Sequence, residues 1–327
     1  MEYTGPFPCG CLGFCIKTRD VKQNQNMKTP LVSIIIPCYN SAAFVKRAIE
    51  SALHQTYPNT EIILVDNNSV DGTLGILKNY QQKHPEKITV LTEKRQGQPS
   101  CRNKGIAGAT GEYIQMLDSD DELLPQKIAN QISAGVEKPP DLVVGNYLSI
   151  RRGKAYPIKA HPDQWVGLVA SKLGITSSLL WRRDAVIKAG WFSERWSSSD
   201  EYELMFRILK SGGRLVYTPA YQTRVFWRDE SVGKSKDPQR LRVIWRQRFG
   251  FRMQIRDYLE ENGTFTKETK YAWEKYMYPQ LVHLKYQLPE IYNEFMPLIN
   301  HDLPVYQAYK PIIAREIRQG FHKVFNL

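Results

Sequence analysis

The sequence predicts an α/β fold: a mostly parallel sheet with flanking helices, followed by a C-terminal helical extension. Two observations predict the sheet. Apolar runs of strand length recur through residues 31–117, and segments with helical spacing of apolar residues separate them by short connections. Such alternation places successive strands parallel, with the helices covering both faces. A third observation, the helical periodicity after residue 238, predicts the extension.

Four strands are predicted in the first half, at residues 31–36, 61–65, 88–91 and 113–117. Polar clusters follow three of them, at residues 37–40, 66–67 and 118–120. Ligands of parallel sheets bind beyond the carboxyl ends of the strands. The three clusters should therefore share one rim and form a site.

The second half is less regular. Strands are predicted at residues 141–145, 147–150, 177–181 and 214–217, a hairpin turn at 151–153, and helices at 183–190 and from residue 200. Serines and acids precede the apolar run of this last helix. An N-cap requires the same residue types, so structure alone could explain Asp200.

Composition indicates a globular protein of 327 residues, with 42% hydrophobic and 24% charged residues. The formal net charge of +12 favours anionic partners: nucleotides, phosphates, nucleic acid or an acidic membrane surface. No nucleic-acid-binding module is found, and we expect no such partner. Five cysteines, an odd number, are typical of a reducing compartment, and we predict a cytoplasmic protein.

The two ends of the chain differ from its middle. Residues 1–28 are expected to be a disordered leader, and residues 226–327 a basic, largely helical extension. Between residues 239 and 256, arginines alternate with apolar residues, and no acid occurs before Asp257. A solvated helical face is the simpler interpretation. Binding to anionic lipid headgroups, hence peripheral contact with the inner face of the membrane, or to a polyanionic acceptor is the alternative.

The fourth predicted strand runs directly into Asp118, Ser119, Asp120 and Asp121. Clustered carboxylates at the end of a buried strand repel one another and resist desolvation. A divalent cation would neutralise them, and Mg²⁺ or Mn²⁺ prefers such hard oxygen ligands. The alternative is an acidic turn that caps the next helix.

Six motifs resemble those of family 2 glycosyltransferases, in the same order. They lie at residues 33–40, 51–58, 61–73, 102–105, 111–121 and 199–207. The resemblance implies a GT-A fold over residues 29–225, with a nucleotide-sugar half at 29–125 and an acceptor half at 126–225. It also implies inverting transfer of a sugar from a nucleoside-diphosphate sugar to a hydroxyl of a glycan or lipid-linked acceptor.

The resemblance assigns the donor pocket as well. Pro37 and Tyr39 would line the base pocket, and Asp66 and Asn67 would face the base and ribose. Many relatives carry a second aspartate where this chain has Asn67. An amide brings no charge to the base edge, so a UDP-sugar is only the default donor. Arg102 would contact the donor.

By the same resemblance, Asp120 would bind Mn²⁺ or Mg²⁺, which would bridge the two phosphates of the donor. Asp118 would reach the ribose or a metal-bound water, and Ser119 belongs to the same donor-binding loop. Inverting transfer needs a general base. The downstream motif places it at Glu201, where relatives often have an aspartate, with Asp200 as the alternative one residue earlier.

Some relatives carry a histidine near residues 226–234 that helps to hold the metal. None is present here, and Arg228 or Lys234 would steady the diphosphate instead. Two other functions stay open. A nucleotidyltransferase that makes nucleotide-sugars would carry a glycine-rich basic loop, which residues 37–40 do not resemble. A non-catalytic glycan- or nucleotide-binding protein would not need the intact acids of the site.

Overall fold

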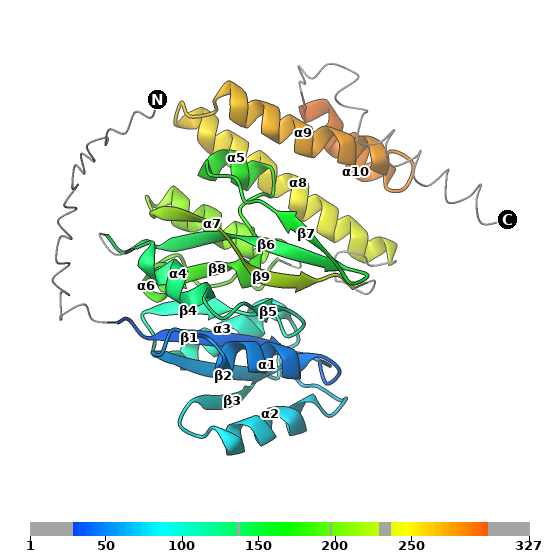
Figure 1. Ribbon diagram of the computed structural model, residues 1–327. Coiled ribbons are helices and arrows are strands. Elements are labelled where there is room, and N and C mark those ends of the chain that lie inside the picture. Colours follow the sequence, from blue (N-terminus) through cyan, green and yellow to red (C-terminus); the bar gives the residue numbers. More distant parts are fainter. Residues whose placement is uncertain (1–28, 136–137, 197, 229–236, 300–327) are drawn as a thin grey trace, which may run out of the picture.

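The structure is a computed structural model that describes residues 29–135, 138–196, 198–228 and 237–299. A nine-stranded sheet runs through the molecule in the order β3-β2-β1-β4-β8-β6-β9-β5, with β7 paired to β6. In Figure 1 the N-terminal strands lie at the bottom and the C-terminal helices at the top. The predicted leader, Lys234 and the end of the tail, residues 300–327, lie outside the described residues.

The N-terminal half contains four parallel strands, as the sequence predicts. They are β1 (Val32–Cys38), β2 (Thr60–Asp66), β3 (Ile88–Thr92) and β4 (Tyr113–Met116). The helices α1 (Val45–Leu53), α2 (Thr73–Lys83) and α3 (Gln98–Gly108) connect them. Because β1 lies between β2 and β4, the carboxyl ends of these three strands meet at one edge.

The second half continues the same sheet with mixed strand directions. Its strands are β5 (Glu122–Leu123), β6 (Leu142–Arg151), β7 (Lys154–Ile158), β8 (Leu179–Arg182) and β9 (Leu215–Phe226). Strand β8 is antiparallel to β4 and β6, whereas β9 is parallel to β6. β6 is one strand where two were predicted. The register between β6 and β9 shifts around Asn146, and this irregularity breaks the apolar pattern there.

Helices of the second half cover the sheet and its end. They are α4 (Lys127–Ser133), α5 (Gln164–Val169), α6 (Arg183–Lys188), α7 (Asp200–Lys210), α8 (Pro238–Glu261), α9 (Lys267–Leu284) and α10 (Pro289–Phe295), with 3-10 turns η1 (Thr176–Ser178) and η3 (Met296–Leu298). Helix α5 was not predicted. The Asp163 carboxylate caps it by accepting from the amides of Trp165 and Val166.

Two large apolar clusters fill the space on either side of the sheet. Along β1, Ile34 and Ile36 belong to one cluster and Ile35 to the other. Both faces of the strand are thus buried, which is typical of parallel sheets. The cluster around Ile35 extends to Phe251 of α8 and Trp273 of α9. The C-terminal helices therefore share a core with the sheet.

Three arginines of α8 have partners or surroundings within the protein. Arg242 pairs with Glu290, and Arg246 with Glu294 at 2.8 Å, both on α10. Arg252 is fully buried. Arg242 and Arg246 are exposed, as expected of a solvated face, whereas the buried Arg252 departs from that interpretation. Among the described helices, none is long and apolar enough to cross a bilayer.

Candidate active site

The three predicted polar clusters meet at the carboxyl edge of the sheet. The amide of Asn67, after β2, donates to the Cys38 carbonyl of β1 at 2.8 Å. The Oγ atoms of Ser41, after β1, and Ser119, after β4, lie 2.9 Å apart. These contacts bring the loops after β1, β2 and β4 together in one site.

The loop of Asp118 to Asp120 is surrounded by cations. Arg228 Nε lies 3.3 Å from Asp120 Oδ2, and Arg47 of α1 donates to the Asp120 carbonyl. Even so, burial and the neighbouring Asp118 charge raise the pKa of Asp120 above its ordinary value. The loop thus holds two acids close together at a partly buried position.

Asp121 does not cap the next helix, since α4 begins only at Lys127. It is buried, accepts from Ser177 Oγ at 2.6 Å and accepts from the Phe226 amide at 3.3 Å. Ser177 Oγ in turn accepts from the Asp118 amide at 3.1 Å. Asp121 and Ser177 therefore tie the acidic loop to η1 and β9.

Arg102 connects the acidic loop with the start of α7. This guanidinium is 1% exposed and donates to Asp200 Oδ2 at 2.6 Å and to Asp118 Oδ1 at 3.2 Å. It also donates to Thr176 Oγ1 at 3.2 Å. Arg102 therefore holds two acidic motifs that are distant in sequence at one point.

Asp200 and Glu201 begin α7 with different surroundings. Asp200 is buried and committed to its ion pair with Arg102. Glu201 is partly buried, and burial together with the Asp200 charge raises its pKa to about 7. A carboxylate of this pKa accepts a proton more readily than an ordinary one, as a general base must. The geometry favours Glu201 over Asp200 for that role.

Asp66, the last residue of β2, and Asn67, which follows it, make different hydrogen bonds. Asp66 is 2% exposed; its Oδ2 accepts from the Ser69 amide at 3.3 Å, and its buried Oδ1 has no hydrogen-bond partner within the described chain. A ligand N–H could satisfy that atom.

Asn67 uses its side chain within the protein. It donates to the carbonyls of Glu93 and Arg95 at 2.9 and 2.7 Å and accepts from the Gly97 amide at 3.0 Å. Both amide hydrogens are used, so Asn67 holds the β3–α3 loop in place. Of its side-chain atoms, only Oδ1 could still make the predicted contact with the base, because an amide oxygen can accept a second hydrogen bond.

The other two residues predicted to line the base pocket lie at the end of β1. Pro37 is buried in the strand, and Tyr39 is 54% exposed at the rim. Asn40 has a φ of 46°, a left-handed conformation that asparagine tolerates. The exposed Tyr39 ring is thus available to a ligand at this edge.

The carboxylates of the acidic loop are suitable ligands for a divalent cation. Asp118 and Asp120 offer hard carboxylate oxygens, which Mg²⁺ and Mn²⁺ prefer. Among the described residues there is no group of three or more acidic, histidine or cysteine side chains that could hold a metal alone. Mg²⁺ is commonly held by one or two carboxylates, substrate phosphates and waters, so two acids suffice.

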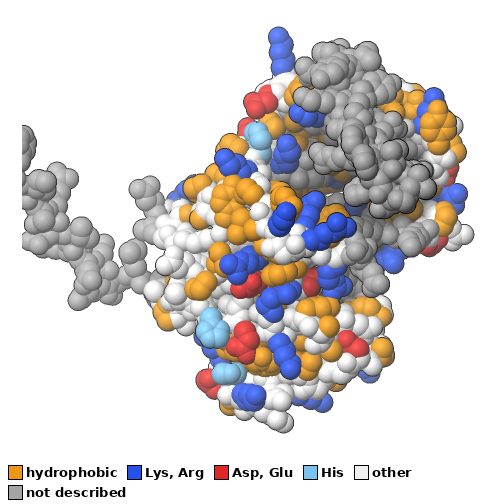
Figure 2. Space-filling model, turned by 45° about the vertical axis from the view of Figure 1, so that its right-hand side comes forward, with side chains coloured by type: hydrophobic (Ala, Val, Ile, Leu, Met, Phe, Trp, Pro, Cys, Tyr) orange, Lys and Arg blue, Asp and Glu red, His pale blue; other side chains and the backbone are white. Residues whose placement is uncertain are grey.

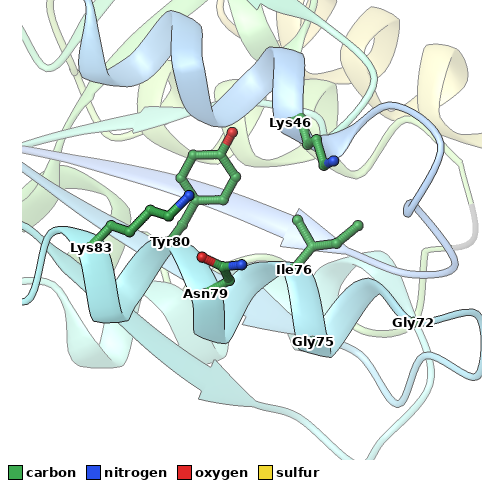
Figure 3. Close-up of a pocket in the computed structure, with 7 residues that line it drawn as sticks. All are labelled: Lys46, Gly72, Gly75, Ile76, Asn79, Tyr80 and Lys83. Carbon is green, nitrogen blue, oxygen red and sulfur yellow. The ribbon is translucent and has the colours of Figure 1, made fainter.

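A surface pocket between α1 and α2 is separate from these residues (Figure 3). It is lined by Lys46, Gly72, Gly75, Ile76, Asn79, Tyr80 and Lys83. None of them was predicted as a site residue, and none belongs to the acidic loop or to the start of α7.

Sequence reasoning missed Ser177, Thr176 and Arg47. Each supports the acidic loop or Arg102 from a segment that carries no recognised motif. The only local signal is a run of small polar residues at 176–178 between apolar segments. That run does not reveal which distant loop it contacts.

The mixed sheet with flanking helices has the architecture of GT-A glycosyltransferase structures. Residues 33–191, just under half of the chain, match the model of glycosyl transferase family 2, and this segment belongs to that family. An uncharacterized glycosyltransferase of Rickettsia felis is 32% identical over 198 residues, which cover 57% of this chain and 32% of that protein. The chain spans 32% to 61% of the curated relatives that it matches.

Solved structures share the fold. TarS of S. aureus, crystallised with UDP-GlcNAc, has a TM-score of 0.61 at 16% identity, over 81% of this chain and 79% of that one. The mannosyltransferase PcManGT of Pyrobaculum calidifontis, in complex with GDP-Man and Mn²⁺, has a TM-score of 0.56 at 17% identity, over 91% and 88%. At such identities the likeness establishes the GT-A fold.

Proposed function

We propose that this protein transfers a sugar from a nucleoside-diphosphate sugar to a hydroxyl of a glycan or lipid-linked acceptor, with inversion and with Mn²⁺ or Mg²⁺ as cofactor. The observation that carries the proposal is Arg102, which contacts Asp118 of the acidic loop and Asp200 beside Glu201. The acids implied for the leaving group and for the acceptor proton thus lie at one site.

Family membership and the ligands of the fold relatives support a nucleotide-sugar donor. TarS was crystallised with UDP-GlcNAc and PcManGT with GDP-Man and Mn²⁺. In this chain, Tyr39 would contact the base face and Asp66 Oδ1 would accept from a base or ribose donor. Residues 29–125 would form the donor half and 126–225 the acceptor half, with the helices beyond as an extension.

In the reaction, Glu201 accepts the proton of the acceptor hydroxyl. The acceptor oxygen forms a bond to the anomeric carbon as the bond from that carbon to the diphosphate breaks on the opposite side, which inverts the configuration. Asp118 and Asp120 would hold the cation; when bound, it stabilises the negative charge that develops on the leaving diphosphate. Arg228, beside Asp120, and Arg47 add positive charge to this edge.

Release of nucleoside diphosphate from UDP- and GDP-sugars with Mn²⁺ tests the proposal. We expect Asp120→Asn to lower this rate by at least about 100-fold, because it removes a charged ligand where charge develops. Asp184→Asn, at an exposed aspartate of α6, is the matched control and should retain the rate.

Three results would contradict the proposal. Release that is unaffected by Asp120→Asn or by removal of divalent cations would exclude the role of the acidic loop. Free pyrophosphate as the product would indicate nucleotidyl transfer. NMR of the new glycosidic linkage tests inversion directly, and a retained anomeric configuration would refute that step.

A further inference from the structure

One face of the β6–β7 hairpin lies beside the acidic loop and has no assigned function. In this antiparallel pair Ser149 is opposite Tyr156, and Arg151 is opposite Lys154. Residues opposite each other share a face, and alternate residues of a strand do too. Arg151, Lys154 and Tyr156 therefore project from one face; together with Arg152 at the turn and Trp227 they are here called the hairpin platform.

Trp227 connects the platform to the candidate active site. Its amide donates to the Ile150 carbonyl at 2.9 Å, and the Arg151 guanidinium lies 4.3 Å from the centre of its ring. The residues on either side contact the acidic loop, since the Phe226 amide binds Asp121 Oδ1 and Arg228 Nε lies 3.3 Å from Asp120 Oδ2. A molecule that rests on Trp227 is thus next to the loop.

The platform combines exposed rings with cations. Trp227 is 50% exposed and Tyr156 is 46% exposed. Amphipathic aromatic rings of this kind are enriched at binding surfaces, and the Arg151 cation over the Trp227 ring fixes its orientation. The apolar C–H faces of sugar rings can pack against such rings, while their hydroxyls remain in water.

Strands β6, β7 and β9 carry basic but no acidic side chains. No Asp or Glu occurs in residues 142–162 or 204–228, which together supply β6, β7 and β9. Within the described part of the chain, no carboxylate forms an ion pair with Arg151, Arg152 or Lys154. Figure 2 turns the right-hand side of Figure 1 towards the viewer and shows many Lys and Arg side chains interspersed with hydrophobic ones and a few Asp and Glu side chains. Such a surface attracts anions.

We propose that the hairpin platform binds the acceptor, and that the acceptor is an anionic glycan bearing phosphate or carboxylate groups. Sugar rings pack on Trp227 and Tyr156, and the anionic groups pair with Arg151, Arg152 and Lys154. This inference rests on the proposed function and adds to it the substrate class. A neutral glycan could pack on the aromatic rings but would offer no anionic group to the three cations.

Binding of defined polymers to the full chain tests the inference. The probes are poly(glycerol phosphate), polygalacturonate and neutral dextran, measured by affinity electrophoresis at low and high salt. We expect one or both polyanions to bind and dextran not to bind. Arg152→Gln with Lys154→Gln should weaken binding about tenfold, with the largest effect at low salt, because exposed charges are screened.

The matched control carries Lys78→Gln and Lys83→Gln on α2, which packs on β2 and β3 at the opposite end of the sheet. It has the same net charge as the hairpin variant and should bind polyanions as the unaltered chain does. Trp227→Ala should also weaken binding. All four substituted cations are exposed, so the charge variants are expected to fold even where Trp227→Ala does not.

The outcomes separate this inference from the proposed function. Equal weakening in both charge variants, or no weakening in the hairpin variant, overturns the platform. Binding of neither polyanion also overturns it. Which polyanion binds distinguishes phosphate from carboxylate as the recognised group. Release of nucleoside diphosphate by the unaltered chain is measured separately, and its absence would count against the proposed function instead.

Discussion

At the scale of single residues, two adjacent acids of α7 have different environments. Asp200 is committed to the buried Arg102 at 2.6 Å, whereas burial and that neighbouring charge raise the pKa of Glu201 to about 7. The motif alone left open which one is the base. Geometry separates them, because an acid that holds a buried guanidinium cannot also accept the acceptor proton without disrupting its ion pair.

The pH dependence of transfer should report Glu201. Its base form is the carboxylate, which is lost as pH falls through about 7, so kcat/KM should decline below that pH. Glu201→Gln should lower kcat by about 10²–10⁴-fold and abolish this limb of the profile. Rates over a pH series, taken with saturating donor, provide the measurement.

Stability supplies the control for this prediction. A raised pKa in the folded state means that the ionised carboxylate destabilises folding above its ordinary pKa, so Glu201→Gln should not lower the melting temperature at pH 8. Asp200→Asn should lower it, because Arg102 loses a charged partner. A fully active Glu201→Gln protein, or an acidic limb that persists in it, would assign the base elsewhere.

At the scale of elements, local pattern predicted the first half well and the second half less well. The four parallel strands are rich in apolar residues and are separated by helices with short connections, so periodicity sufficed. Strand β9 was predicted to end at Tyr217 but continues to Phe226, because pairing with β6 past a register shift sustains it. No local pattern encodes that pairing.

The site was predictable to the same extent. The motifs place Asp66, Asp118 and Glu201 in the sequence, and the strand ends bring the first two to one edge. The tasks of Asn67 and Arg102 depend on partners 26 to 98 residues away, which the sequence does not specify. Sequence reasoning named both residues, but the contacts that they make inside the protein were not foreseeable.

Asn67 should matter to the loop between β3 and α3. Asn67→Asp removes both donors and places an acidic oxygen near the carbonyls of Glu93 and Arg95. We expect a loss of about 2 kcal/mol in the free energy of unfolding and faster amide exchange at residues 93–97. Asn79→Asp, at an exposed position of α2, is the matched control. Unchanged exchange in the loop would show that Asn67 does not hold it.

At the scale of the molecule, one sheet and the two large apolar clusters on its faces join the halves. Strands β4 and β8 are hydrogen-bonded neighbours, and the cluster around Ile35 reaches α8 and α9. Unfolding of the described body should therefore be cooperative, and a ligand at the rim should stabilise all of it. Thermal unfolding is thus a suitable test of donor binding.

We expect UDP with Mn²⁺ to raise the melting temperature, with GDP as the competing donor nucleotide and ADP as the control. At a ligand concentration of about 100 times Kd the stabilisation is about 2.7 kcal/mol. Asp66→Asn should reduce the shift, because its buried Oδ1 would no longer be a charged acceptor. Asp184→Asn should leave the shift unchanged. A larger shift with GDP would replace uracil by guanine as the recognised base, and no shift with any nucleotide would contradict a donor pocket at this rim.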